Sequence, residues 1–202
     1  MKKSLLVLLA LVGTTAFAVI QDKEWTAVKT KDAAITISLP HGWIAADEKD
    51  PDYLKSVQLI REKNPKFAEA MKPGENPDQQ LLMFNLEDDL ADGVMDSMTV
   101  VTKNLPGLSD SMLDEIGKQV VATLPSRTKA EYEIIDTPVG KTLTYSGGMD
   151  VVVDATTTTK MDLLGYIYLK GETLNVITFA TGDQQLKTKK TLFDKIFRTI
   201  KS

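Results

Sequence analysis

The residues best suited to chemistry lie in an acidic stretch near the middle of the chain. Glu87, Asp88, Asp89 and Asp92 fall within six residues, and Asp96 follows closely. Calcium prefers oxygen ligands and takes roughly six to eight of them. The spacing differs from that of an EF-hand loop, and a solvated acidic loop explains the same pattern. We therefore expect a solvated acidic loop and no cofactor. The alternative is a metal site, with Glu87, Asp88, Asp89 and Asp92 as the candidate ligands and calcium as the candidate ion.

Residue types that perform covalent catalysis are scarce in this sequence. Its 202 residues include one histidine, His41, and no cysteine. A histidine base needs a nucleophile and an orienting acid beside it, and no Gly-x-Ser-x-Gly motif supplies that nucleophile. His41 stands between a proline and a glycine, which is typical of an exposed turn. We predict that the protein is not an enzyme and assign no catalytic residue. A carboxylate- or metal-dependent hydrolase is the alternative.

Three aromatic residues are candidates for lining a ligand pocket. They are Trp43, Tyr166 and Tyr168, whose rings would suit an apolar small molecule or a lipid. Aromatic side chains also dominate the packing energy of protein cores. We therefore expect core or interface residues, and a ligand pocket lined by these rings is the alternative.

The first eighteen residues have the features of a secretory signal peptide. Lys2 and Lys3 are followed by an apolar run at positions 4–12, and Ala16-Phe17-Ala18 is a small-x-small cleavage site. We predict cleavage after Ala18 and export to the periplasm or the extracellular medium. With no cysteine, lipid modification of a lipoprotein is excluded. We expect no transmembrane segment after cleavage, and one domain over residues 19–202.

The charge of the chain bears on the class of its partner. The formal net charge is −4 at pH 7, and such a surface repels nucleic acid phosphates. We therefore predict no nucleic-acid partner. A protein partner or an apolar small-molecule ligand in the cell envelope is expected instead.

Hydrophobic periodicity predicts an alternation of strands and helices. Helices are expected at 53–62, where Leu54, Val57 and Ile60 recur at helical spacing, and after Ser111 as N-cap, with an apolar stripe at Leu113, Ile116, Val120 and Leu124. Gly147-Gly148 predicts a bulge or bend, and the stretch from Thr156 to Lys160 fits either a turn or a strand. Strands are expected at 25–29, 33–39, 81–86, 97–105, 132–135, 141–145, 151–153, 163–169 and 174–181, and a last helix at 188–200.

The last two predicted strands are apolar on both of their faces. In the strand at 163–169, Leu163 and Ile167 lie on one side and Leu164 and Tyr166 on the other. A strand buried on both faces needs cover on both sides. We predict an α+β fold: a mostly antiparallel β-sheet flanked by helices on both faces, which is an α/β/α sandwich.

Three features together resemble the Mog1/PsbP-like superfamily. A strand at 35–39 runs directly into Pro40-His41-Gly42-Trp43, a strand-to-helix unit follows at 99–124, and a strand at 176–180 leads into a final helix with Phe193, Ile196 and Phe197. The superfamily includes PsbP-like proteins and LpqN-like exported bacterial proteins. The resemblance implies an α/β/α sandwich and an adaptor, assembly or ligand-binding role, and it brings no shared set of catalytic residues.

The sequence therefore predicts an exported non-catalytic binding or assembly module of the bacterial cell envelope. A carrier of an apolar small molecule or lipid is one alternative, and a hydrolase is another. A third is a protein whose uncovered sheet edge near Thr156 pairs with a partner chain.

Overall fold

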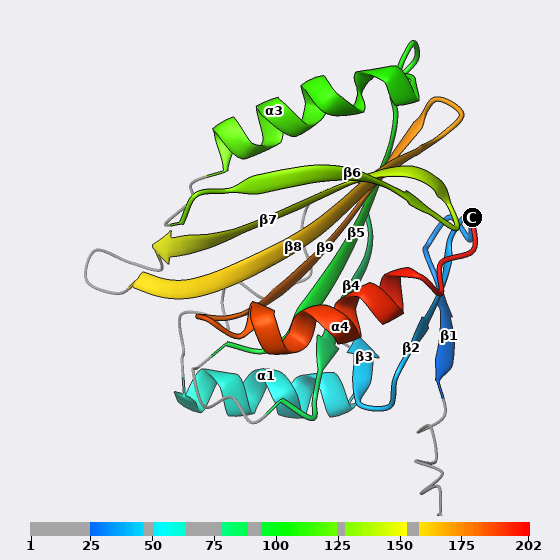
Figure 1. Cartoon of the computed structure of the whole chain (residues 1–202). Helices are drawn as coiled ribbons and strands as arrows, with labels where there is room; N and C mark the ends of the chain where they lie inside the picture. Colours follow the sequence, from blue (N-terminus) through cyan, green and yellow to red (C-terminus); the bar gives the residue numbers. More distant parts are fainter. Residues whose placement is uncertain (1–24, 47–50, 64–77, 89–93, 125–127, 153–157) are drawn as a thin grey trace, which may run out of the picture.

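The computed structural model describes residues 25–46, 51–63, 78–88, 94–124, 128–152 and 158–202. Two antiparallel sheets dominate this part of the chain (Figure 1). The helices are α1 (Pro51–Lys63), the short 3-10 helix η1 (Asp110–Met112), α3 (Leu113–Thr123) and α4 (Leu186–Phe197). The strands are β1 (Thr26–Lys29), β2 (Thr36–Leu39), β3 (Trp43–Ala45), β4 (Gln79–Asn85), β5 (Ser97–Asn104), β6 (Glu131–Thr137), β7 (Gly140–Val152), β8 (Thr158–Lys170) and β9 (Thr173–Gly182).

The larger sheet has seven strands in the order β3-β4-β5-β9-β8-β7-β6, and β1 pairs with β2 in a separate hairpin. Every pairing is antiparallel. The predicted α+β fold with a mostly antiparallel sheet is confirmed. The positions of the predicted strands and helices in the described residues are also confirmed, with bounds that shift by a few residues, and β3 is a strand that the sequence pattern did not predict.

The long strand β7 corrects the prediction of a bulge or bend at Gly147-Gly148. Its register with β8 runs without a break, with Gly147 opposite Leu163 and Gly148 opposite Asp162. The backbone N–H of Gly148 also has a hydrogen-bond partner, because it donates to the Thr128 hydroxyl at 2.7 Å. A β-bulge inserts one extra residue into one strand of a pair. Because the residues of β7 and β8 pair one to one here, the strand contains no bulge.

Two helix predictions need correction in detail. Ser111 is not an N-cap: it lies within η1, where its hydroxyl contacts that of Ser109 at 2.8 Å, and α3 begins after Met112 without a side-chain cap. Among the α1 side chains whose burial the structure describes, Tyr53 is the buried one and stacks on Phe84, whereas Leu54 is 51% exposed. The aromatic ring therefore takes the core position that the aliphatic spacing had suggested for leucine.

The stretch from Thr158 to Lys160 belongs to strand β8 and pairs with β7. Residues 153–157, and with them Thr156, lie outside the described residues. The two edges of the seven-stranded sheet are β3 and β6, so pairing of a partner chain with an edge near Thr156 stays a prediction.

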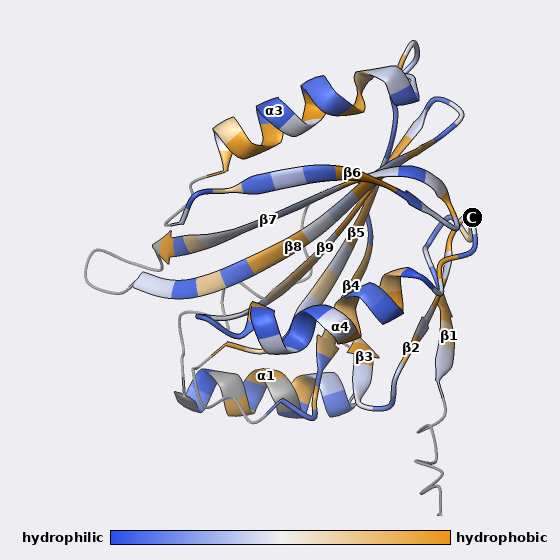
Figure 2. Cartoon of the chain, viewed as in Figure 1, coloured by the Kyte–Doolittle hydropathy of each residue, from blue (hydrophilic) through white to orange (hydrophobic). Residues whose placement is uncertain are grey.

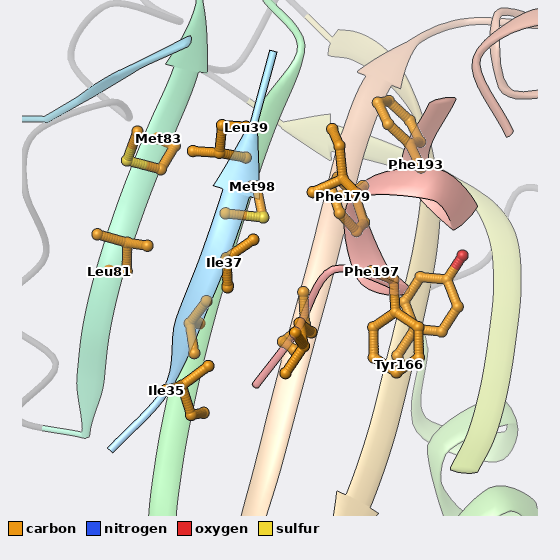
Figure 3. Close-up of a cluster of buried hydrophobic side chains, with 14 of the residues drawn as sticks. Ile35, Ile37, Leu39, Leu81, Met83, Met98, Tyr166, Phe179, Phe193 and Phe197 are labelled. Carbon is orange, nitrogen blue, oxygen red and sulfur yellow. The ribbon is translucent and has the colours of Figure 1, made fainter. Parts of the chain in front are cut away.

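The main core lies between α4, the β1-β2 hairpin and the central strands. Figure 3 shows Phe193 and Phe197 of α4 beside Phe179 of β9 and Tyr166 of β8. The Tyr166 and Phe197 rings stack with centroids 4.0 Å apart. The next residue along β8, Ile167, belongs to a different cluster, which contains Leu143 and residues of α3. Figure 2 shows the same strand as apolar through its middle.

The apolar stripe of α3 is confirmed. Leu113 is fully buried, and Ile116, Val120 and Leu124 pack against the same cluster as Ile167. Helical periodicity places these four side chains on one face, so burial of that face is the direct consequence of their spacing.

Gly165 is predicted to be intolerant of any side chain. It lies opposite Tyr145 in the β7–β8 register, and a Cβ atom there would overlap the Tyr145 ring. The Tyr145 hydroxyl is held at 2.9 Å from that of Thr178, which limits how far the ring can retreat. We expect Gly165→Ala to lower the free energy of unfolding by about 1–3 kcal/mol, measured by urea denaturation. In a Tyr145→Ser background the same substitution should cost clearly less, and an equal cost would contradict this explanation.

Candidate functional site

The turn that carries His41 is confirmed as an exposed one. Gly42 has φ of +91°, a conformation that glycine adopts without strain. The Nδ1 atom of His41 lies 2.9 Å from Oε1 of Glu87, and these side chains are 70% and 43% exposed. A side-chain contact so accessible to water contributes little to stability. The contact places Glu87 against the turn.

Asp88 contacts a buried network centred on Asp96. The Asp96 carboxylate is completely buried and accepts hydrogen bonds from the Lys189 ammonium and the Thr181 hydroxyl, each at 2.7 Å. Asp88 accepts the backbone N–H of Asp96 at 2.9 Å, and its carboxylate lies 4.0 Å from the Lys189 ammonium. Lys189 thus supplies the positive charge that two neighbouring acidic residues require.

Of the four candidate metal ligands, the structure describes two, and these contact different groups. Glu87 contacts His41 and Asp88 contacts the Asp96 network, while Asp89 and Asp92 lie outside the described residues. Within the described ranges, no group of three or more acidic, histidine or cysteine residues is arranged to hold a metal ion. Calcium binding by the whole acidic stretch stays an untested alternative.

The three candidate ligand-binding aromatic residues lie in the core. Trp43 is 8% exposed, Tyr166 1% and Tyr168 0%. Trp43 meets the edge of Phe179 with ring centroids 6.4 Å apart, and Tyr168 packs against Phe197. This is the core interpretation that the sequence favoured, and a ligand role for these residues stays an untested alternative.

Two of these aromatic residues carry buried hydroxyl groups. Burial raises the pKa of the Tyr166 hydroxyl, and its hydrogen bond to the Asp194 carboxylate raises the pKa further. Burial raises the pKa of Tyr168 to about 12. The Tyr168 hydroxyl makes no hydrogen bond in the described part of the chain. Both phenols are therefore neutral at physiological pH.

A groove of about 820 Å³ lies at the end of the sheet beside the C-terminal segment. We call it the C-terminal groove. Figure 1 shows this end of the chain next to the β1-β2 hairpin and the turn between β6 and β7. Its volume falls in the range of roughly 300–1,000 Å³ that is usual for ligand sites. The groove is lined by Ser38, Pro138, Val139, Lys170, Arg198, Thr199, Ile200, Lys201 and Ser202.

The backbone that forms the C-terminal groove is held by hydrogen bonds. Lys201 and Thr36 exchange two backbone hydrogen bonds, at 2.8 and 2.9 Å. The Thr199 hydroxyl accepts the Ser38 N–H at 2.9 Å, and it donates to the Ile196 carbonyl at 2.7 Å, with the Ser38 carbonyl 3.2 Å away. The segment after α4 is therefore attached to β2 at several points, and its side chains extend from an ordered backbone.

Three cations line the C-terminal groove, from separate segments of the chain. Lys170 ends β8, Arg198 follows α4, and Lys201 precedes the last residue. All three are exposed. Among the residues that the structure describes, these three cations form no ion pair. Sequence reasoning did not identify this site, because its residues meet only in the folded chain. The one local signal is the pair of basic residues after the last helix.

Comparison with solved structures identifies the architecture. A point mutant of the protein Mog1 superposes on this chain with a TM-score of 0.50 and 14% sequence identity, covering 88% of this chain and 95% of that chain. The chain has the Mog1/PsbP-like fold. The predicted resemblance is thus confirmed at the level of the fold, which is all that so low an identity supports.

Two further solved structures are similar to this chain. The cyanobacterial PsbP of Synechocystis sp. PCC 6803 gives a TM-score of 0.49 and 15% identity, covering 91% of this chain and 95% of that chain. The Ran-binding protein Mog1p of Saccharomyces cerevisiae gives 0.48 and 15%, covering 89% and 95%. No protein-family model and no curated protein matches the sequence.

None of the described helices has the length and apolar character needed to span a bilayer. The predicted signal peptide, residues 1–18, lies outside the described residues, and its cleavage stays a prediction.

Proposed function

We propose that the chain is an exported, non-catalytic binding or assembly module of the bacterial cell envelope that binds a protein partner at the C-terminal groove. The observation that carries the proposal is the groove itself: an open site on hydrogen-bonded backbone, with three cations that form no ion pair among the described residues. Because hydrogen bonds already order the backbone of the groove, less conformational entropy is lost on binding. Export rests on the residues before position 19.

The proposal includes helices over both faces of the sheet, as in an α/β/α sandwich. Tyr166 stacks on Phe197 of α4, whereas its neighbour Ile167 clusters with Ile116 of α3. Successive residues of a strand point to opposite faces, which supports this arrangement. Such a sheet acts as a rigid support for a site at its end.

Native mass spectrometry of the protein from the exported fraction of its own host tests the function. We expect a mass corresponding to residues 19–202 and a complex with a second protein. A bound lipid or apolar molecule would instead favour the carrier alternative, and a calcium-sized adduct that is removed by a chelator would favour a metal site. Either ligand in place of a protein partner would contradict the proposal.

A photocrosslinking residue tests the position of the site. Placed at Lys170, it should crosslink the partner that mass spectrometry detects. Placed at Lys160, it should not, because Lys160 is exposed on the same strand but lies about 33 Å away at 3.3 Å per residue. Equal crosslinking from both positions would place the partner elsewhere.

A further inference from the structure

Some basic side chains on or next to α4 have an interaction partner within the protein, and others do not. Lys189 binds the buried Asp96, and Lys190 binds Asp194 at 2.9 Å. Lys195 lies over the Trp25 ring, 4.7 Å from its centroid. Arg198 and Lys201, which come next along the chain, form no ion pair with described residues. Lys187 of α4 also forms no ion pair with described residues, so Arg198 and Lys201 are distinguished from it by their position in the lining of the C-terminal groove.

The lining of the C-terminal groove combines positive charge with hydroxyl and apolar groups. Lys170, Arg198 and Lys201 are the charged side chains of the lining, and all three are positive. An arginine binds a carboxylate with two parallel hydrogen bonds, and a lysine adds a compact point charge. Because the chain as a whole is acidic, with a net charge of −4, this local excess would orient an anionic partner.

The apolar part of the lining favours an acidic polypeptide over an anionic lipid. Three of the nine lining residues are apolar, namely Pro138, Val139 and Ile200. They provide contact for the methylene groups of acidic side chains, but an acyl chain needs a much longer apolar surface. Spaced cations along an open groove suit carboxylates that are spaced along a polypeptide.

We propose that the C-terminal groove binds an acidic segment of the partner protein, with Arg198, Lys170 and Lys201 contacting its carboxylates. This inference rests on the proposed function and adds the chemistry of the partner. Binding of this kind is governed by exposed charges, so it is weakened by salt.

The test is fluorescence anisotropy with a labelled hexaglutamate peptide, and with hexaglutamine as the neutral probe. The triple variant Lys170→Gln, Arg198→Gln, Lys201→Gln should weaken hexaglutamate binding about tenfold, because it removes all three exposed cations of the groove. The matched control is Arg61→Gln, Lys160→Gln, Lys187→Gln, which removes the same charges from exposed positions outside the groove. It should change the affinity less than about twofold.

Each other outcome overturns the inference. Equal loss of affinity in both triple variants would mean attraction by overall charge alone. Binding of hexaglutamine as tight as that of hexaglutamate would exclude charge recognition. Inorganic phosphate that displaces the peptide, or binding seen only with phosphatidylglycerol vesicles, would point to a phosphate or lipid ligand. A partner that crosslinks to position 170 while hexaglutamate fails to bind would leave the proposed function standing and reject the acidic segment.

Discussion

Replacing Lys189 with methionine is expected to lower the free energy of unfolding by about 3–5 kcal/mol. The Asp96 carboxylate is fully buried, and Lys189 lies 2.7 Å from its Oδ2 atom. Thr181 would still donate to Oδ1, but a hydroxyl does not neutralise the charge. The methionine therefore leaves a carboxylate without a counterion in the core. Urea denaturation followed by tryptophan fluorescence measures the loss.

The neighbouring lysine is the matched control. Lys190 pairs with Asp194 at 2.9 Å, but the two side chains are 52% and 35% exposed. Water screens such a pair, so Lys190→Met should cost about 0–1 kcal/mol. Similar losses for the two substitutions would mean that helix α4, rather than the buried charge, determines the effect.

A second substitution isolates the charge. In the Lys189→Met protein, Asp96→Asn removes the carboxylate that has lost its partner while keeping its shape. The double variant should recover about 2 kcal/mol relative to Lys189→Met alone. If Asp96→Asn instead lowers the stability of the Lys189→Met protein, the carboxylate is not left unpaired there and the explanation is wrong.

The elements that the sequence predicted well have a simple periodic pattern. Ile35, Ile37 and Leu39 alternate with polar residues, and all three are about 1% exposed in the core. The stripe of α3 behaves in the same way. Hydrophobic periodicity gave wrong predictions where a large side chain or hydrogen bonding of the backbone decides the local structure. Tyr53 occupies the buried position of α1 through its stacking on Phe84, and pairing on both edges keeps Gly148 in an extended strand.

The candidate site was harder to predict, because its contacts join distant segments. Lys189 and Asp96 are 93 residues apart, and a lysine in a surface helix is ordinarily solvated. Lys170 lines the same groove as Arg198 and Lys201, although 28 or more residues separate it from them in the sequence. The local sequence indicated the acidic stretch that contacts Asp96. Lys189, which neutralises Asp96, is positioned by strand order and helix packing.

Replacing Phe179 with alanine is expected to lower the free energy of unfolding by about 3–5 kcal/mol. The Phe179 side chain is fully buried. It stacks on Phe193 with ring centroids 4.6 Å apart and meets the rings of Trp43 and Tyr166 edge to face. Alanine removes the ring around which these three side chains are arranged, and the strands on either side of β9 restrict how far the cavity can close.

The controls separate a packed core from a ligand pocket. Phe179→Leu keeps most of the volume and should cost clearly less than alanine, and Ile134→Ala on the edge strand β6, where the side chain is 41% exposed, should cost under about 1 kcal/mol. If Trp43 and Tyr166 instead line a ligand site, they have room to rearrange. The alanine variant would then lose less than about 1 kcal/mol without ligand, and that result would reject the core assignment of these aromatic residues.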